Sequence, residues 1–199
     1  MLDNARSRAL AAHILDPISK ALLALRLTAS SVTVLGALGS ILVSVLCVAQ
    51  GRFLLAAVLM LPLAGADAID GTMARIAGTQ GPWGAFLDST TDRITDGAIF
   101  ASIAWWLMRD GDTASAIAAL VGLIAGFVTS YIRAKAESLG VECKVGIAER
   151  PERVGGAMLG VFLAGIGFDI MLPVLVYVIA VLSCVTVMQR MLVVRRALG

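Results

Sequence analysis

The chain has 199 residues, of which 59% are hydrophobic and only 15% are charged. This composition is typical of an integral membrane protein and excludes an ordinary water-soluble core. The formal net charge is only +2, so the sequence does not predict the strongly basic surface of a nucleic-acid-binding protein. At this length we expect a single domain that spans residues 1–199.

The first 28 residues differ from the rest of the chain. Apolar residues recur there at helical spacings, interrupted by basic residues and by Asp16-Pro17. The pattern predicts an amphipathic helix in the membrane interface, kinked or restarted at Asp16-Pro17. We interpret this juxtamembrane segment, residues 1–28, as a basic anchor without a catalytic role. The hydroxyl-bearing residues between Thr28 and Thr33 then supply caps for the first spanning helix.

Apolar stretches occupy most of the remaining sequence. They run over residues 31–50, 53–75, 84–108, 113–138, 154–168 and 170–192. Most of them approach the ~20 residues that a membrane-spanning helix requires. The sequence therefore predicts an all-α integral membrane protein with six transmembrane helices and an N-terminal interfacial helix.

The basic residues predict the orientation of these helices. With the N-terminus inside, all but two of the 16 Lys and Arg residues lie on the cytoplasmic side, the exceptions being Arg52 and Arg109. Cytoplasmic loops of membrane proteins carry such an excess of positive charge. We therefore expect both termini and the polar motif described next to lie at the cytoplasmic face.

Four regularly spaced aspartates interrupt the apolar background. The first motif is Asp67-x-x-Asp70-Gly71-x-x-Ala74-Arg75, and the second, after eight residues, is Gly84-x-x-x-Asp88-x-x-x-Asp92. Spacings of three and four place the aspartates and small residues of each motif on one helical face. If the two faces meet, they form an all-oxygen ligand set without histidine or cysteine. Such a set suits magnesium or manganese.

A solvated polar face or a set of helix caps would be the plainest explanation of these aspartates. However, apolar stretches flank both motifs, and an ionised carboxylate at the bilayer centre costs roughly 2.5–3.5 kcal/mol. Buried carboxylates in such surroundings usually mark function. A cation channel or carrier is the alternative of another class, and it predicts carboxylates near the midplane with no need for the small residues. The position of the aspartates near helix ends, beside Arg75 and Arg93, favours an enzyme.

The motif resembles the signature of the CDP-alcohol phosphatidyltransferase family. The resemblance covers every fixed position, namely Asp67, Asp70, Gly71, Ala74, Arg75, Gly84, Asp88 and Asp92. Three further segments resemble the actinobacterial branch of this family, which makes phosphatidylinositol phosphate. They are Asp92-Arg93-Ile94-Thr95-Asp96-Gly97, Ser130-Tyr131-Ile132-Arg133-Ala134-Lys135-Ala136-Glu137 and Glu149-Arg150-Pro151-Glu152-Arg153.

The resemblance implies a role for each motif residue. Asp67, Asp70 and Asp88 are expected to be metal ligands, and Asp92 both a ligand and the general base. Two divalent cations, Mg²⁺ or Mn²⁺, are expected to assist the departure of CMP while an acceptor hydroxyl attacks the phosphorus bonded to diacylglycerol. The residues expected to bind CDP-diacylglycerol are Ser31, Val32, Thr33, Asp67, Asp70, Gly71, Ala74 and Arg75. The family usually has Pro-Asp where this chain has Ala29-Ser30.

A basic set marks the expected acceptor site. We expect Lys135 and Arg153, with Arg195 and Arg133 in support, to bind a phosphorylated acceptor, because guanidinium and ammonium groups bind phosphate. Positive-inside anchoring also explains basic loops, and we prefer it for Lys144 and Arg196. Together with the resemblance, the set predicts transfer of the phosphatidyl group to inositol 1-phosphate. Glycerol 3-phosphate and free inositol remain alternative acceptors.

The remaining expectations concern assembly and packing. The resemblance implies a homodimer in the plasma membrane of a bacterium, with the active site at the cytoplasmic face. We interpret the glycines of the spanning stretches, such as Gly122 and Gly126, as helix-packing residues. The cysteines lack metal-binding spacing and are interpreted as packing residues, which excludes a zinc site; they are Cys47, Cys143 and Cys184.

Overall fold

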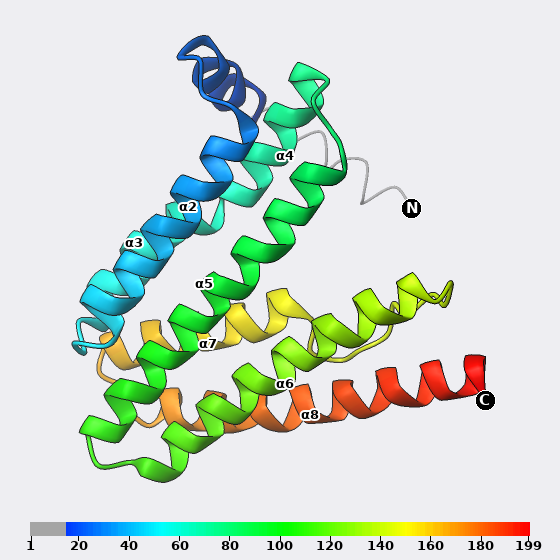
Figure 1. Cartoon of the computed structure of the whole chain (residues 1–199). Coiled ribbons are helices and arrows are strands. Elements are labelled where there is room, and N and C mark those ends of the chain that lie inside the picture. Colours follow the sequence, from blue (N-terminus) through cyan, green and yellow to red (C-terminus); the bar gives the residue numbers. More distant parts are fainter. Residues whose placement is uncertain (1–14) are drawn as a thin grey trace, which may run out of the picture. The chain divides into compact units, whose positions relative to one another are not determined.

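The computed structural model describes residues 15–199, and all its regular elements are helices (Figure 1). Residues 15–24 are helical and precede the elements α2 (Ala29–Val43), the π-helix η1 (Ser44–Val48), α3 (Phe53–Ala64), α4 (Ala66–Ala77), α5 (Pro82–Arg109), α6 (Thr113–Ser138), α7 (Arg150–Gly165) and α8 (Met171–Leu198). No strand occurs in this described part of the chain. Residues 1–14 of the predicted amphipathic segment lie outside it.

Four helical segments are long and apolar enough to cross a membrane. They are Ala29–Val48, Phe53–Ala77, Thr113–Ser138 and Met171–Leu198. The other two predicted spans form the helices α5 and α7, which do not meet this criterion of length and apolar composition. The N-terminal half of α5 carries the second aspartate motif, and α7 has 16 residues, fewer than the ~20 that a spanning helix needs. An all-α membrane protein is thus confirmed, whereas six spans and an interfacial N-terminal helix remain predictions.

The stretch expected as one helix over residues 53–75 is divided into α3 and α4. Pro62 lies inside α3 and supplies no N–H, and Gly65 forms the N-cap of α4. The break places Asp67 in the first turn of α4, where the helix dipole favours a carboxylate. Gly78, in the left-handed conformation with φ 65°, ends α4 as glycine does at many helix C-termini.

The chain divides into two compact units, each of which is described by itself. Among the described residues, the first comprises 15–41 together with Leu59–Thr95. Within it the Oγ of Ser19 donates to the backbone oxygen of Ile69 at 3.4 Å, which joins the helix over residues 15–24 to α4. A Cβ on Gly36 would lie 2.7 Å from the Cβ of Ala66, so α2 and α4 approach closely only because residue 36 is glycine.

The second unit comprises Leu42–Val58 and Asp96–Gly199. In it α8 packs against both α6 and α7. The Asp112 side chain caps α6 by accepting from the backbone N–H of Ser115 at 3.0 Å, and hydrogen bonding to Ser115 lowers the pKa of the Asp112 carboxyl. Large buried side chains fill the core of this unit, among them Phe100, Ile103, Leu107, Val161, Leu172 and Val176. Cys47 and Cys143 are buried packing residues as predicted, whereas Cys184 is exposed.

Candidate active site

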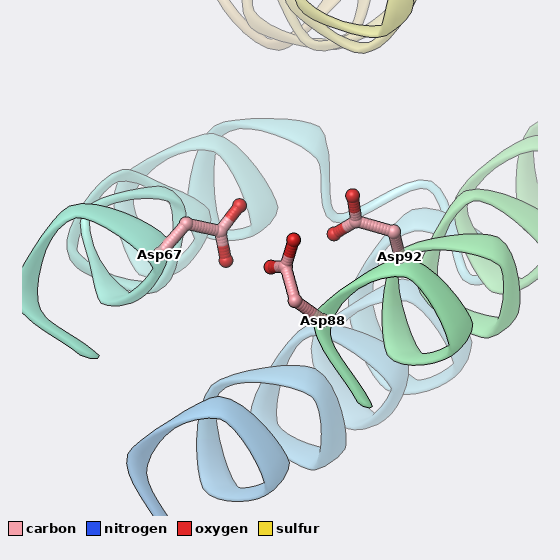
Figure 2. A group of neighbouring side chains, drawn as sticks. All are labelled: Asp67, Asp88 and Asp92. Atoms are coloured by element: carbon pink, nitrogen blue, oxygen red, sulfur yellow. The ribbon is translucent and has the colours of Figure 1, made fainter. Parts of the chain in front are cut away.

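Three of the four motif aspartates meet in space. Asp67 comes from α4, and Asp88 and Asp92 come from successive turns of α5. One carboxylate oxygen of each lies within 4.8 Å of the others, and Figure 2 shows the three side chains pointing toward a common space. The prediction that the two aspartate faces meet is therefore confirmed for these three residues.

The fourth aspartate, Asp70, is buried and has a different partner. Its Oδ2 accepts a hydrogen bond from the Thr33 hydroxyl of α2. Thr33 was predicted as a nucleotide contact, and the structure shows that it orients a motif aspartate. The neighbouring Ser31 belongs to the helix cap, because its backbone N–H donates to the Thr28 hydroxyl at 3.1 Å. The predicted capping by hydroxyl-bearing residues is thus confirmed.

Asp92, the predicted general base, forms an ion pair with the residue that follows it. Its Oδ2 lies 3.1 Å from the Nη2 of Arg93. The Asp92 side chain is 14% exposed, whereas the Arg93 side chain is 32% exposed. The guanidinium donates to this oxygen and fixes the orientation of the carboxylate.

The small residues of the first motif leave one face of α4 accessible. Gly71 is exposed, and a Cβ built on it would meet no atom of the described chain within 4 Å. Gly71 therefore does not serve helix packing within this chain. Arg75 lies one residue beyond Ala74, and its Nη2 reaches back to the Thr72 hydroxyl at 3.4 Å. The α4 backbone is therefore open at Gly71, one residue beyond Asp70.

The cluster fits a hard divalent cation. Three carboxylates within 4.8 Å repel one another, and a bound cation would offset that repulsion. All three donors are oxygens, the ligands that Mg²⁺ and Mn²⁺ prefer. Asp67, Asp88 and Asp92 are therefore the residues that would hold the metal, with Asp70 beside Asp67 on the same helix.

The predicted acceptor residues have unequal surroundings. Arg153 is only 4% exposed, and its Nη1 donates to the backbone oxygen of Ala148 at 2.9 Å. Arg133 is exposed and its Nε lies 3.0 Å from the Oε1 of Glu137, one helical turn away. Lys135 and Arg195 are exposed at the ends of α6 and α8. The structure thus distinguishes one buried arginine from three surface cations.

A second buried arginine was not predicted as a functional residue. Arg190 of α8 is 4% exposed, and all three of its guanidinium nitrogens donate hydrogen bonds. The acceptors are the backbone oxygens of Val145 and Thr129, each at 2.8 Å, and the Oε1 of Glu149 at 3.2 Å. The only feature of the sequence that indicated this structural role is the position of Arg190, several residues before the end of the apolar helix α8.

An unpredicted ion pair joins α5 to the start of α7. The Nε of Arg150 lies 3.1 Å from the Oδ1 of Asp96, whose side chain is 6% exposed. Asp96 follows Asp92 by four residues and so continues the helical face that carries Asp88 and Asp92. The spacing could have revealed Asp96, but its partner is 54 residues away in the sequence.

The structure combines a helical membrane fold with an aspartate cluster on two successive helices, and comparison with known proteins shows the class of enzyme to which this combination belongs. A family model of CDP-alcohol phosphatidyltransferases matches residues 26–188. The chain belongs to the CDP-alcohol phosphatidyltransferase family, and it is therefore a transferase of phospholipid biosynthesis.

Curated relatives share most of the chain. The phosphatidylinositol phosphate synthase of Corynebacterium glutamicum is 39% identical over 180 residues, which cover 89% of this chain and 82% of that protein. The protein of the same name from Cutibacterium acnes is 39% identical over 198 residues, with 94% of each chain covered.

Solved structures of the Mycobacterium tuberculosis phosphatidylinositol phosphate synthase have the same fold. The structure with CDP-DAG bound has a TM-score of 0.87 and 35% identity, and covers 92% of this chain and 94% of that chain. The complex with manganese and citrate has a TM-score of 0.86 and 35% identity, with 89% and 87% covered. The similarity supports the predicted enzyme class and its use of a divalent metal.

Proposed function

We propose that this enzyme transfers the phosphatidyl group from CDP-diacylglycerol to inositol 1-phosphate, with phosphatidylinositol phosphate and CMP as products. The observation that carries the proposal is the cluster of Asp67, Asp88 and Asp92, whose carboxylate oxygens lie within 4.8 Å of one another. The names of the relatives support the acceptor, and the CDP-DAG-bound relative supports the donor.

The aspartate cluster would hold the metal. We infer that Asp67, Asp88 and Asp92, with Asp70, hold two divalent cations, Mg²⁺ or Mn²⁺. When bound, such cations neutralise the pyrophosphate and the charge that develops on the departing CMP. The manganese-bound relative supports this assignment.

Asp92 is the proposed general base. In this mechanism it accepts the proton of the acceptor hydroxyl, and the hydroxyl oxygen attacks the phosphorus bonded to diacylglycerol. A new phosphorus–oxygen bond forms, the bond to CMP breaks, and the proton on Asp92 passes to water. Arg93 holds Oδ2 of Asp92, which keeps the base from rotating away from the attacking hydroxyl.

The nucleotide is proposed to lie against the open face of α4. Gly71 and Ala74 allow close approach to the helix backbone, and Arg75 exchanges its contact with Thr72 for a phosphate oxygen. Ser31, Val32 and Thr33 remain proposed contacts at the start of α2. Through Thr33, this part of the site also holds Asp70 in place.

The acceptor phosphate is proposed to bind Lys135 and Arg153, with Arg133 and Arg195 in support. A charge-assisted contact to phosphate contributes about 1.5–3 kcal/mol, and each 1.4 kcal/mol is about tenfold in affinity. Lys135→Ala or Arg153→Ala should therefore raise KM for inositol 1-phosphate roughly ten- to a hundredfold. Arg196→Ala, an exposed neighbour that we assign to membrane anchoring, is the control and should leave this KM unchanged.

An acceptor panel tests the proposal. Purified enzyme receives CDP-diacylglycerol and Mg²⁺ with inositol 1-phosphate, glycerol 3-phosphate or free inositol, and released CMP is measured. We expect efficient release only with inositol 1-phosphate. A preference for either other acceptor would show that the acceptor assignment is wrong. If no acceptor releases CMP, the transfer reaction itself is contradicted and the cation-carrier alternative gains support.

A further inference from the structure

Gly126, in the middle of α6, lies directly against the guanidinium group of Arg153. We infer that Gly126 is a positioning residue for the acceptor: its missing side chain creates the space that fixes the Arg153 guanidinium. This inference rests on the proposed function, in which Arg153 binds the acceptor phosphate. Gly126 itself would touch neither substrate, so it would act only through Arg153.

A methyl group at Gly126 would crowd the guanidinium of Arg153. A Cβ built there would lie 3.0 Å from the Nε, 3.3 Å from the Cζ and 3.4 Å from the Nη2 of Arg153. Nonbonded carbon atoms prefer separations of about 3.5–4.0 Å. Three atoms of the guanidinium are thus closer to the built Cβ than the preferred separation. The guanidinium therefore packs directly against the backbone of α6 at Gly126.

Hydrogen bonds hold the same guanidinium from other sides. The Nη1 of Arg153 donates to the backbone oxygen of Ala148 at 2.9 Å and to the Oγ1 of Thr129 at 3.4 Å. Thr129 is 1% exposed, and its hydroxyl in turn donates to the backbone oxygen of Gly126 at 2.8 Å. We call the enclosure formed by Gly126, Thr129 and Ala148 the arginine seat. Because folding already orders the side chain in this seat, less conformational freedom remains to be lost when a phosphate binds.

A second glycine of α6 shows that this arrangement is specific. Gly122 lies one turn earlier, and a Cβ there would be 3.6 Å from the Cγ2 of Ile179 and 3.7 Å from both Ala180 and Phe100. These are ordinary packing distances. Gly122 therefore fits the predicted role of a helix-packing glycine, whereas Gly126 faces a charged group.

The test compares one added methyl group at these two positions. In Gly126→Ala the guanidinium must move by a few tenths of an ångström, and misplacement by about 1 Å can cost on the order of a hundredfold. We expect KM for inositol 1-phosphate to rise about three- to tenfold, while kcat and KM for CDP-diacylglycerol stay within about twofold. Gly122→Ala, the matched control, should keep wild-type kinetics. Gly126→Val should approach the roughly ten- to hundredfold effect of Arg153→Ala.

A double-mutant cycle distinguishes action through Arg153 from a general disturbance of α6. In an Arg153→Ala background, Gly126→Ala should cause no further rise in KM for the acceptor. The apparent Tm should show the same coupling. Gly126→Ala should lower the Tm of the wild type, because the added methyl group crowds Arg153. In the Arg153→Ala background it should not lower the Tm, because the crowding is gone and alanine favours a helix more than glycine does.

Three results would overturn the inference: a wild-type acceptor KM in Gly126→Ala, an equal rise for both substrates, or effects that multiply in the double variant. If Arg153→Ala itself leaves acceptor kinetics unchanged, the proposed acceptor site is wrong and the positioning role falls with it. The Tm cycle separates the two failures, because coupling there shows that the arginine seat exists whichever substrate the enzyme uses.

Discussion

At the scale of single residues, the four motif aspartates are not equivalent. Asp67, Asp88 and Asp92 bring their oxygens together, whereas Asp70 is buried and accepts a hydrogen bond from Thr33. Within the cluster, only Asp92 is adjacent in sequence to a guanidinium that pairs with it. The motif therefore combines ligands of the proposed metal site with two aspartates that also contact Thr33 or Arg93.

The proposed base can be removed while its shape is kept. We expect Asp92→Asn to lower the rate of CMP release at least about a hundredfold, because general bases typically contribute 10²–10⁴-fold. Binding of CDP-diacylglycerol should change little. Asp110→Asn, an exposed aspartate between α5 and α6, is the control and should behave as the wild type. Turnover that persists in Asp92→Asn, or in the wild type with excess chelator, would contradict the assigned base or the metal requirement, respectively.

The open face of α4 gives a second prediction. We expect Gly71→Val and Ala74→Leu to fold normally but to lose at least about tenfold in CDP-diacylglycerol affinity, since added bulk would occupy the space proposed for the nucleotide. Binding is measured in detergent with the labelled lipid nucleotide. Ala68→Val, at an exposed and variable position of the same motif, controls for a β-branched residue in α4. Wild-type affinity in both motif variants would remove Gly71 and Ala74 from the binding site.

At the scale of elements, α8 anchors the connection that leads from α6 into α7. The hydroxyl of Thr186 accepts from the backbone N–H of Ala148 at 3.0 Å, and Arg190, one turn later, donates to the backbone oxygen of Val145. Arg190 also reaches Glu149, the N-cap residue of α7. The start of α7, and with it Arg153, is therefore held by side chains of α8.

Removing this anchor should destabilise the protein. Arg190→Met leaves the carbonyl groups of Val145 and Thr129 and the Glu149 carboxylate without this donor, which we expect to cost about 2–3 kcal/mol. For a chain of this size, that corresponds to a fall in apparent Tm of roughly 4–12 °C. Arg196→Met, on the exposed part of the same helix, should change the Tm by no more than about 1–2 °C. Equal Tm values for the two variants would show that the Arg190 hydrogen bonds contribute little to stability.

At the scale of the whole molecule, the orientation in the membrane and the homodimer remain predictions. The excess of basic residues places the connection between α6 and α7 inside and that between α5 and α6 outside. Both connections carry exposed residues, Lys144 in the first and Asp110 in the second. These two positions therefore provide a direct test of the orientation.

Thiol labelling of intact cells measures the side on which each connection lies. In a Cys184→Ser background, which removes the exposed native thiol, we expect Asp110→Cys to react with an impermeant reagent added outside. Lys144→Cys should react only after the membrane is permeabilised. The reverse pattern would show that the active site faces the outside, and that the positive-inside count misled the assignment.

The homodimer can be tested on the same membranes. Cross-linking followed by mass measurement should give a species of twice the chain mass, and this species should persist after dilution into detergent. A chain that remains monomeric under conditions in which it is active would contradict the expectation.

Sequence alone predicted much of this protein. Apolar stretches predicted the positions of most helices, because a helix that crosses the hydrocarbon core needs a run of about 20 apolar residues. The stretch over 53–75 is divided into α3 and α4, and α8 continues six residues beyond the expected end at 192. The aspartate spacing placed the four aspartates on two helical faces, because residues three and four apart share a face, and the structure brings three of the four together, namely Asp67, Asp88 and Asp92. The similarity to phosphatidyltransferases followed from the same spacing and is confirmed by the family match.

What only the tertiary structure decided depends on contacts between distant residues. Pairing of Asp96 with Arg150, burial of Arg190 and the contact between Gly126 and Arg153 join positions 27 to 61 residues apart, and no helical period relates such positions. In sequence, Gly126 resembles Gly122, and nothing distinguishes the buried Arg153 from the exposed Lys135. The packing of α6, α7 and α8 places apolar side chains beside Gly122 and the Arg153 guanidinium beside Gly126. These neighbours determine that the first glycine serves helix packing, whereas the second contacts a charged group.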